Sequence, residues 1–423
     1  MQRYNTYKDS GVKWLGEIPS HWEMIKSKYL WKESFSISEN GNEELLSVSQ
    51  YDGITPAKGD SRSESLKGYK IVSENDLVIN IMLAWMGGLG VSKYDGIVSP
   101  AYCVYKLTKD SNPKYLHYLY KTPLYLAEFA RHSSGVIPSR WRMYTDDFGQ
   151  VVSLLPPRKE QDAIVEYLDE KMAKIDTAIA QQQKMIDLLN ERKQIIINRA
   201  VTKGLNPNAK MKDSGVEWIG EVPEGWEVRR LKHLLKASLM YGANESAESE
   251  DESYPRYIRI TDIDEDGKLR PDTFRSLPPK KAEPYLLKKG ELLFARSGAT
   301  AGKTYLFNED IKACFAGYLI KASLKEPLLP EYLDYYTKSG IYDNWKKSIF
   351  IQATIPNIGA EKYANLQITL PSIKEQKDIV KHLDVETGKI NQVVRNCKNQ
   401  ISLLQERKQI IINEVVTGKV KVV

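Results

Sequence analysis

The chain contains two stretches of sequence that each occur twice. Residues 8–30 and 212–234 are identical at 13 of 23 positions, including Trp22 and Trp226. Near the end of each half, the octapeptide 191–198 (Glu-Arg-Lys-Gln-Ile-Ile-Ile-Asn) recurs unchanged as 406–413. A repeat period above 200 residues is typical of duplicated domains rather than of the short repeats of a solenoid. The chain is therefore predicted to consist of two tandem halves that open and close alike.

The spacing of the repeats locates an insertion in the second half. The opening segments are 204 residues apart and the closing segments are 215 apart, so the second middle region is 11 residues longer. Asp76–Ile79 already aligns with Glu291–Phe294 at the larger offset, which places the extra residues between about 235 and 290. The acidic, serine-containing run 244–252 lies in that interval, and its composition predicts a solvated loop.

Composition excludes several classes of protein. A chain of 423 residues predicts two or more domains, and its net charge of +6 is only weak support for nucleic-acid binding. Cys103, Cys314 and Cys397 are too scattered to suggest a disulfide framework or a zinc site, which favours a reducing cytoplasm. We expect neither a membrane span nor a signal peptide, because the longest apolar run is short and the first residues lack an apolar core.

Both middle regions are predicted to mix helices and strands. Short apolar runs bounded by Gly and Asp-Gly predict strands at 77–83, 101–107, 291–295 and 318–322. Pro113 and Pro330 are each placed to start a helix, because proline suits the first helical turn. We expect these helices to run to about Arg131 and Lys347.

Each half is predicted to end in a long helix, at roughly 157–203 and 372–417. Apolar residues recur at steps of seven along both segments, and no proline interrupts either of them. A plain helical core element is the alternative, but a seven-residue repeat on a long helix favours burial against another helix. Two-fold symmetry between the halves would make the pair antiparallel. The residues expected at the seam are Leu168, Ile175, Leu189, Ile196, Leu383, Ile390, Leu404 and Ile411.

No catalytic motif is complete. Gly298–Thr304 has three residues between its glycines where a phosphate-binding P-loop needs four, and a strand-like segment follows it. Ser99–Tyr102 lacks the second proline of the amino-methyltransferase tetrapeptide and has no glycine-rich cofactor loop before it. The five histidines show no metal-binding or triad spacing, so we expect no metal site and no catalytic residue.

The remaining signal is a mixture of basic, polar and aromatic residues in the loops of both middle regions. Arginine can form paired hydrogen bonds with guanine, and lysine and arginine pair with phosphates, although any single such residue is more often a plain surface charge. Arg140 or Arg142, and separately Arg296, are the residues expected to contact bases. The full set of candidate DNA-binding residues is Lys58, Arg62, Lys70, Arg140, Arg142, Arg256, Arg259, Arg296, Lys303, Lys346 and Gln352.

Nearly the whole chain resembles the specificity subunit of type I restriction–modification enzymes. The resemblance is carried by Lys8–Pro19 and its second copy, by Leu155–Gln161 with Leu370–Gln376, and by the doubled octapeptide. It implies an α+β fold in which two α/β target-recognition domains are separated by two long helices, which pair as a pseudo-two-fold symmetric antiparallel coiled coil. The implied domains are 1–155 and 206–371 for target recognition, with 156–205 and 372–423 as the helical spacers.

The same resemblance implies that this chain recognises DNA while other subunits carry out the chemistry. Each target-recognition domain would read half of a bipartite site in double-stranded DNA, and the similar ends would dock two methyltransferase subunits, with restriction and motor subunits joining them. S-adenosylmethionine, ATP and Mg²⁺ would belong to those partners, and this chain would hold no cofactor. Two other functions remain open: an enzyme with an aberrant phosphate loop at Gly298–Thr304, and a coiled-coil scaffold that binds no DNA.

Overall fold

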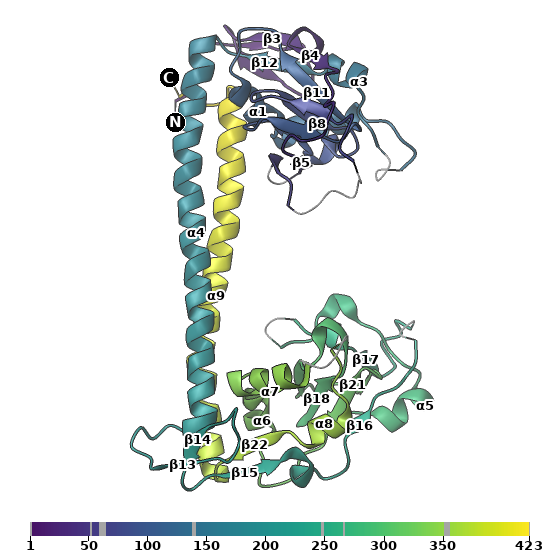
Figure 1. The fold of residues 1–423 in the computed structure, drawn as a ribbon, viewed down its shortest axis with the longest axis vertical. Coiled ribbons are helices and arrows are strands. Elements are labelled where there is room, and N and C mark those ends of the chain that lie inside the picture. The colour runs from purple at the N-terminus through teal and green to yellow at the C-terminus, as the bar shows by residue number, and fades with distance from the viewer. Residues whose placement is uncertain are drawn as a thin grey trace. The chain divides into compact units, whose positions relative to one another are not determined.

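The computed structural model describes residues 2–50, 53–58, 65–137, 141–246, 249–264, 267–350 and 356–422. The chain folds as two compact units, of which unit 1 comprises residues 1–183 with 398–423, and unit 2 comprises residues 184–397. Two long helices, α4 (Arg158–Lys203, teal in Figure 1) and α9 (Ile373–Val416, yellow), each contribute to both units. The predicted α+β class is confirmed. The four-part linear division into domains stays a prediction.

Unit 1 is built on an antiparallel four-stranded sheet with the order β4-β11-β8-β9, accompanied by two-stranded pairs. Its strands are β1 (Tyr7–Asp9), β2 (Glu17–Pro19), β3 (Glu23–Lys26), β4 (Trp31–Ser34), β5 (Leu46–Ser49), β6 (Gly53–Pro56), β7 (Lys70–Val72), β8 (Leu77–Asn80), β9 (Leu89–Val91), β10 (Gly96–Val98), β11 (Tyr102–Leu107) and β12 (Val152–Leu155). Its other helices are α1 (Pro113–Tyr120), α2 (Pro123–Arg131) and α3 (Thr145–Gln150).

Unit 2 repeats this plan, with a four-stranded sheet in the order β16-β21-β18-β19. Its strands are β13 (Met211–Asp213), β14 (Glu221–Pro223), β15 (Glu227–Arg230), β16 (Met240–Tyr241), β17 (Arg256–Ile258), β18 (Glu291–Ala295), β19 (Thr304–Phe307), β20 (Ala313–Phe315), β21 (Leu319–Ala322) and β22 (Gln367–Leu370). Its other α-helices are α5 (Pro279–Ala282), α6 (Pro330–Tyr336), α7 (Gly340–Phe350) and α8 (Ala360–Ala364). The four strands predicted from apolar runs correspond to β8, β11, β18 and β21.

The single helices expected after Pro113 and Pro330 are wrong, because each segment forms two helices. In unit 1 the break falls at Thr122, whose hydroxyl caps α2, and Pro123 cannot continue a preceding helix because it lacks an N–H. In unit 2 the break falls at Ser339, whose hydroxyl accepts a hydrogen bond from the Tyr342 N–H at 3.5 Å. Both breaks thus start a new helix with its own side-chain cap.

The long helices pair in both units. In unit 1, Leu168 and Met172 of α4 belong to the same buried cluster as Ile411 and Val415 of α9. The ammonium of Lys408 on α9 also lies 2.6 Å from the carboxylate of Asp176 on α4. The beginning of α4 therefore lies beside the end of α9, so the helices are antiparallel as predicted.

In unit 2 the end of α4 lies beside the beginning of α9. Ile197 and Val201, near the end of α4, share a buried cluster with Ile379 and Leu383, near the beginning of α9. Of the heptad residues expected at the seam, the structure buries Leu168, Leu383, Ile390 and Ile411 and partly buries Ile175, Leu189, Ile196 and Leu404.

A buried tryptophan attaches the helix pair to the strands in each unit. The indole N–H of Trp22 donates to Glu160 at 3.2 Å, and that of Trp226 donates to Glu375 at 3.3 Å. The glycine after the opposite helix passes close to each ring, and a Cβ added at Gly204 would lie 3.1 Å from Trp226. Gly204 has a φ of +69°, which suits a glycine just beyond a helix end. The duplicated opening sequence is therefore explained by a duplicated attachment.

The seam of the helix pair gives a direct stability test on α9. Leu383 is fully buried, whereas Leu403 is 57% exposed on the same helix. We expect Leu383→Ala to lower the free energy of unfolding by about 2–5 kcal/mol, because it leaves a cavity. Leu403→Ala should change it by no more than about 0.5 kcal/mol. Urea unfolding followed by circular dichroism measures both, and equal effects of the two changes would contradict the seam described here.

Candidate nucleic-acid interface

Each unit presents a pair of loops at the same place in its fold. In unit 1, the β8–β9 connection (81–88) meets the segment before α3, where the Met143 N–H donates to the Ile81 carbonyl at 3.0 Å. In unit 2, the β18–β19 connection (296–303) meets the segment before α8. There the Ile358 N–H donates to the Arg296 carbonyl at 2.8 Å. We call these places loop surface 1 and loop surface 2.

Loop surface 1 is apolar and aromatic. The indole of Trp85 packs edge-on against that of Trp141, with ring centroids 5.4 Å apart, and donates a hydrogen bond to the Met82 carbonyl at 3.2 Å. Met82 and Tyr144 beside them are exposed. Such side chains suit contact with thymine methyl groups or stacking, because they offer apolar area rather than charge.

Loop surface 2 occupies the equivalent place with different chemistry. The guanidinium of Arg296 lies 5.2 Å from the centre of the Tyr241 ring. Tyr318, whose carbonyl accepts a hydrogen bond from the Arg296 backbone N–H, is 69% exposed. A guanidinium held over an aromatic ring is restricted in position, and its planar set of donors can match a guanine edge.

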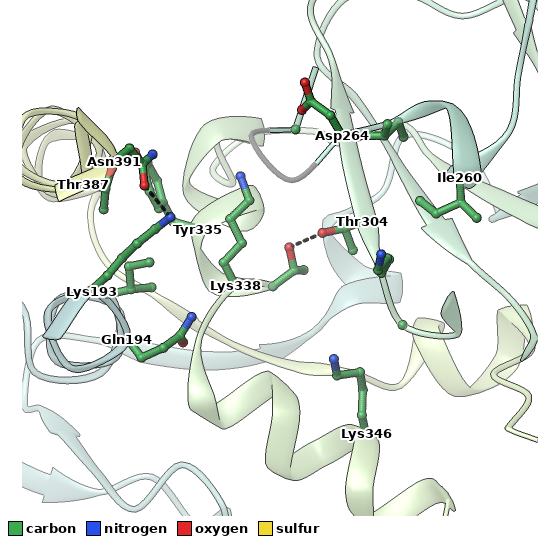
Figure 2. A pocket seen from close by; sticks show the side chains of 16 residues that line it. Lys193, Gln194, Ile260, Asp264, Thr304, Tyr335, Lys338, Lys346, Thr387 and Asn391 are labelled. Carbon is green, nitrogen blue, oxygen red and sulfur yellow. Dashed lines mark hydrogen bonds between the residues drawn. The ribbon is translucent and has the colours of Figure 1, made fainter. Parts of the chain in front are cut away.

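A cleft of about 460 Å³ lies within unit 2, between the helix pair and the strands, and we call it the lysine cleft (Figure 2). One wall of the cleft is formed by Lys193 and Gln194 of α4 and by Thr387 and Asn391 of α9. The Lys193 ammonium donates a hydrogen bond to the Asn391 amide oxygen at 2.8 Å. The opposite wall contains Lys303, Thr304, Thr337, Lys338 and Lys346. Four lysines from separate parts of the chain thus line one cleft.

Two of the four lysines in this cleft form ion pairs with aspartates of their own helical region. Lys338 pairs with Asp334 at 2.5 Å and Lys346 pairs with Asp343 at 2.7 Å. Among the described residues, the exposed ammonium of Lys303 has no ion-pair or hydrogen-bond partner. Tyr335, beside Lys338, keeps its hydroxyl proton because burial and a hydrogen bond to Asp384 raise its pKa above its ordinary value. The cleft is therefore lined by four lysines, by Asp264 and by a neutral tyrosine hydroxyl that donates to Asp384.

The structure separates the predicted DNA-binding residues by their surroundings. Lys58 and Arg142 are exposed, whereas Lys70 is half-buried with its ammonium 3.6 Å from Glu33. The guanidinium of Arg259 forms two hydrogen bonds with the Asp262 carboxylate, at 2.7 and 3.1 Å, which makes it part of the local fold. Three of the candidates, Arg62, Arg140 and Gln352, lie outside the described residues.

Within unit 2 the remaining candidates fall into two groups. Arg256 is engaged with the fold, because it donates to the Arg270 carbonyl at 2.7 Å. Arg296 belongs to loop surface 2, and Lys303 and Lys346 line the lysine cleft. Sequence reasoning missed Lys193 and Lys338, although Lys193 lies in the repeated octapeptide. The seam residues Leu168, Ile175, Leu189, Ile196, Leu383, Ile390, Leu404 and Ile411 lie apart from both surfaces, on α4 and α9.

Other chemistry has little support in the described parts of the chain. They contain no group of three His, Cys, Asp or Glu side chains that could hold a metal ion, and the three cysteines are free. No described helix is both long and apolar enough to cross a membrane. Gly298–Thr300 forms a short 3-10 helix, and the strand β19 follows at Thr304 where a P-loop would require a helix.

Comparison with known proteins relates the chain to a family with a DNA specificity domain. Residues 223–402 match the family model described as type I restriction modification DNA specificity domain. The type I restriction enzyme MjaVIII specificity subunit of Methanocaldococcus jannaschii is 24% identical, over 98% of this chain and 97% of its own length. The EcoBI specificity subunit of Escherichia coli is 22% identical, over 84% of this chain and 75% of its own.

A solved structure shares the fold across almost the whole chain. It comes from a study of complex assembly and conformational transition in a type I restriction–modification system. It superposes with a TM-score of 0.70 at 15% identity and covers 94% of this chain and 98% of its own. With its duplicated ends and antiparallel long helices, the chain is similar along nearly its whole length to specificity subunits of type I restriction enzymes, and residues 223–402 match the DNA specificity domain of that family.

Proposed function

We propose that this chain gives a type I restriction–modification system its DNA sequence specificity by binding a bipartite site in double-stranded DNA. The observation that carries the proposal is the pair of loop surfaces, which occupy equivalent places on similar frames but present different side chains. Loop surface 1 offers Trp85, Trp141 and Met82, whereas loop surface 2 offers Arg296 and two exposed tyrosines. Each unit then reads one half-site, and the two half-sites differ.

The repeated octapeptide supports docking of two copies of one partner. Ile195 is 60% exposed on α4, and its counterpart Ile410 is 48% exposed on α9. Two turns earlier, Leu188 and Leu403 are likewise exposed at equivalent positions. Exposed apolar residues that recur in the same sequence context offer two like surfaces, as two identical methyltransferase subunits would require. Restriction and motor subunits join this core.

In this proposal the chain itself is not catalytic and works in the cytoplasm. S-adenosylmethionine, ATP and Mg²⁺ act on the partner subunits, and this chain supplies DNA sequence recognition and docking surfaces. Neither the rival enzyme nor the rival scaffold gains support from a specific feature, since Gly298–Thr304 lacks the helix that a P-loop needs. Turnover of S-adenosylmethionine or ATP by the purified chain alone would contradict the proposal.

Arg296 tests base recognition by loop surface 2. We expect Arg296→Lys to weaken binding of the cognate duplex by about 1–3 kcal/mol and to relax one position of one half-site, because lysine keeps the charge but loses the paired donors. Methylome sequencing of cells that express the variant with its methyltransferase reads out the recognised word. A uniform loss over all duplexes, with the word unchanged, would mark Arg296 as a phosphate contact instead.

Ile195 and Ile410 test the docking surfaces. We expect Ile195→Glu or Ile410→Glu to reduce the co-purifying methyltransferase from two subunits per chain to one, and the double variant to retain none. The physical reason is that a buried, unpaired carboxylate would oppose docking. Native mass spectrometry counts the subunits. As a matched control, Ile311→Glu changes a comparably exposed isoleucine outside the long helices and should leave two bound. Equal losses in all three single variants would contradict the assignment.

The long helices test whether the gap between the half-sites is set by helix length. Inserting four residues after Gln183 in α4 and four after Cys397 in α9 adds about 6 Å to each helix and rotates its faces by only about 40°. Since a base-pair step is about 3.4 Å, we expect the same two half-site words with a gap longer by one or two base pairs. Methylome mapping measures the gap.

A matched insertion separates helix length from chain length. The same four residues placed after Leu205, just beyond α4, lengthen a connection without lengthening either helix, so the gap should stay unchanged. New half-site words in the helix-insertion variant, or an unchanged gap, would show that the helices do not set the spacing.

A further inference from the structure

The β8–β9 connection of loop surface 1 contains no charged residue. Residues 81–88 read Ile-Met-Leu-Ala-Trp-Met-Gly-Gly, and Met82 and Met86 are 40% and 37% exposed. Tyr144, on the adjoining segment before α3, is 50% exposed. Thioethers and aromatic ring faces offer contact area but little hydrogen-bonding capacity. Exposed side chains of this kind that gather in one place mark a surface that binds by apolar contact.

Contacts within unit 1 hold this connection in one shape. The Trp85 indole N–H donates to the Met82 carbonyl at 3.2 Å, which satisfies the polar end of the ring. The Lys121 ammonium donates to the Gly87 carbonyl at 2.8 Å, at the end of the connection. The connection is also hydrogen-bonded to the segment before α3, as described above. The backbone that presents the two methionines is therefore ordered before a ligand binds, which favours a specific contact.

The equivalent connection in unit 2 presents smaller side chains. At the repeat offset of 215, Met82 corresponds to Ser297. Met86 corresponds to Ala301 at the same offset. The backbone turns match, because the N–H of Met86 and the N–H of Ala301 each donate at 3.0 Å to the carbonyl three residues earlier. The apolar surface is therefore a property of unit 1 and not of the shared fold.

The charged side chains at the edges of loop surface 1 do not give it a dominant sign. Arg142 and Asp146 lie on either side of Tyr144 in the sequence, and both are exposed. Lys121, at the other edge, donates to two backbone carbonyls. Electrostatic attraction therefore does not select what binds at this place, and the apolar side chains do.

The position of loop surface 1 indicates which ligand it contacts. It is equivalent to loop surface 2, whose Arg296 we assign to a base edge. The main apolar group that base edges present in the major groove is the C5-methyl group of thymine. The other edges present donors and acceptors that a methionine cannot pair, and a buried group without a partner costs free energy. Apolar side chains at this position therefore favour A·T pairs whose methyl group faces the protein.

We propose that unit 1 recognises its half-site through thymine methyl groups, which contact Met82 and Met86 beside the pair of Trp85 and Trp141. The inference rests on the proposed DNA-binding function and adds the class of base edge that unit 1 reads. The two units then read DNA by different means, with apolar contact in unit 1 and guanidinium hydrogen bonds in unit 2. The half-site of unit 1 contains at least one thymine whose methyl group is needed for full affinity.

The test uses the chain assembled with its methyltransferase subunits and duplexes that contain the mapped site. Each thymine of both half-sites is replaced in turn by deoxyuridine, which keeps every hydrogen-bonding group and lacks only the methyl. Loss of one buried methyl group should weaken binding about fourfold. The effect should be confined to one half-site. Fluorescence anisotropy of labelled duplexes measures Kd.

Two variants connect the methyl group to the methionines. Met82→Ser and Met86→Ala each give unit 1 the residue that unit 2 carries at the equivalent position. In at least one of them, the duplexes with thymine and with deoxyuridine should bind alike at the position that wild type discriminates. Tyr94→Ser is the matched control, because Tyr94 is 37% exposed and follows β9 at the end away from the connection. This control should keep the wild-type preference for thymine.

The outcomes that contradict the inference differ from failure of the proposed function. If the wild-type complex binds no duplex with sequence preference, the proposed function fails. Specific binding that is insensitive to deoxyuridine at every position overturns only the methyl contact. So does a preference for thymine that persists in both methionine variants. Loss of co-purifying subunits from these variants, with unchanged affinity for DNA, would assign loop surface 1 to a protein partner. Thermal unfolding is compared with wild type, and a variant of unchanged stability decides.

Discussion

The antiparallel pairing of α4 with α9 is the constraint on which the remaining structure depends. In each unit the first turns of one long helix lie against the last turns of the other, and the sheet attaches to both through a buried tryptophan. The Trp22–Glu160 and Trp226–Glu375 contacts require a helix start and a glycine-terminated helix end at the same place. Each unit therefore needs the start of one long helix and the end of the other, which explains why unit 1 combines residues 1–183 with residues 398–423.

This shared frame restricts where the two units can differ. Residues that attach the sheet to the helices are repeated, as Gln161 and Gln376 illustrate. Each of these two side chains accepts a hydrogen bond from a backbone N–H and donates one to a proline carbonyl. Residues in the β8–β9 and β18–β19 connections make no such attachment to the long helices. Residues as different as Trp85 and Thr300 can therefore occupy equivalent positions in the two connections. A duplicated protein that, as we propose, docks two like partners and reads two different DNA half-sites is expected to divide its residues in this way.

Much of the architecture could be predicted from the sequence, because its signals are periodic or repeated. The seven-residue spacing gave both long helices within a residue or two at each end, and four apolar runs correspond to strands. The single helices expected after Pro113 and Pro330 were wrong because capping by Thr122 and Ser339 is a local effect that apolar periodicity does not report. Among the candidate binding residues, the sequence alone could not distinguish Arg259, which is hydrogen-bonded to Asp262, from Arg296, which lies over the Tyr241 ring.

The sequence by itself determined the duplication, the helix pairing and the family resemblance, since identical segments and heptads are visible without coordinates. Tertiary structure alone decided which charges act together. Lys193 precedes Lys303 and Lys338 by more than a hundred residues in the sequence, yet all three line one cleft. In unit 1 the counterpart of Lys193 is Lys408, which pairs with Asp176, and the counterpart of Lys338 is Lys121, which donates to backbone carbonyls. Electrostatic character depends on distances between side chains across elements, and those distances exist only once the chain has folded.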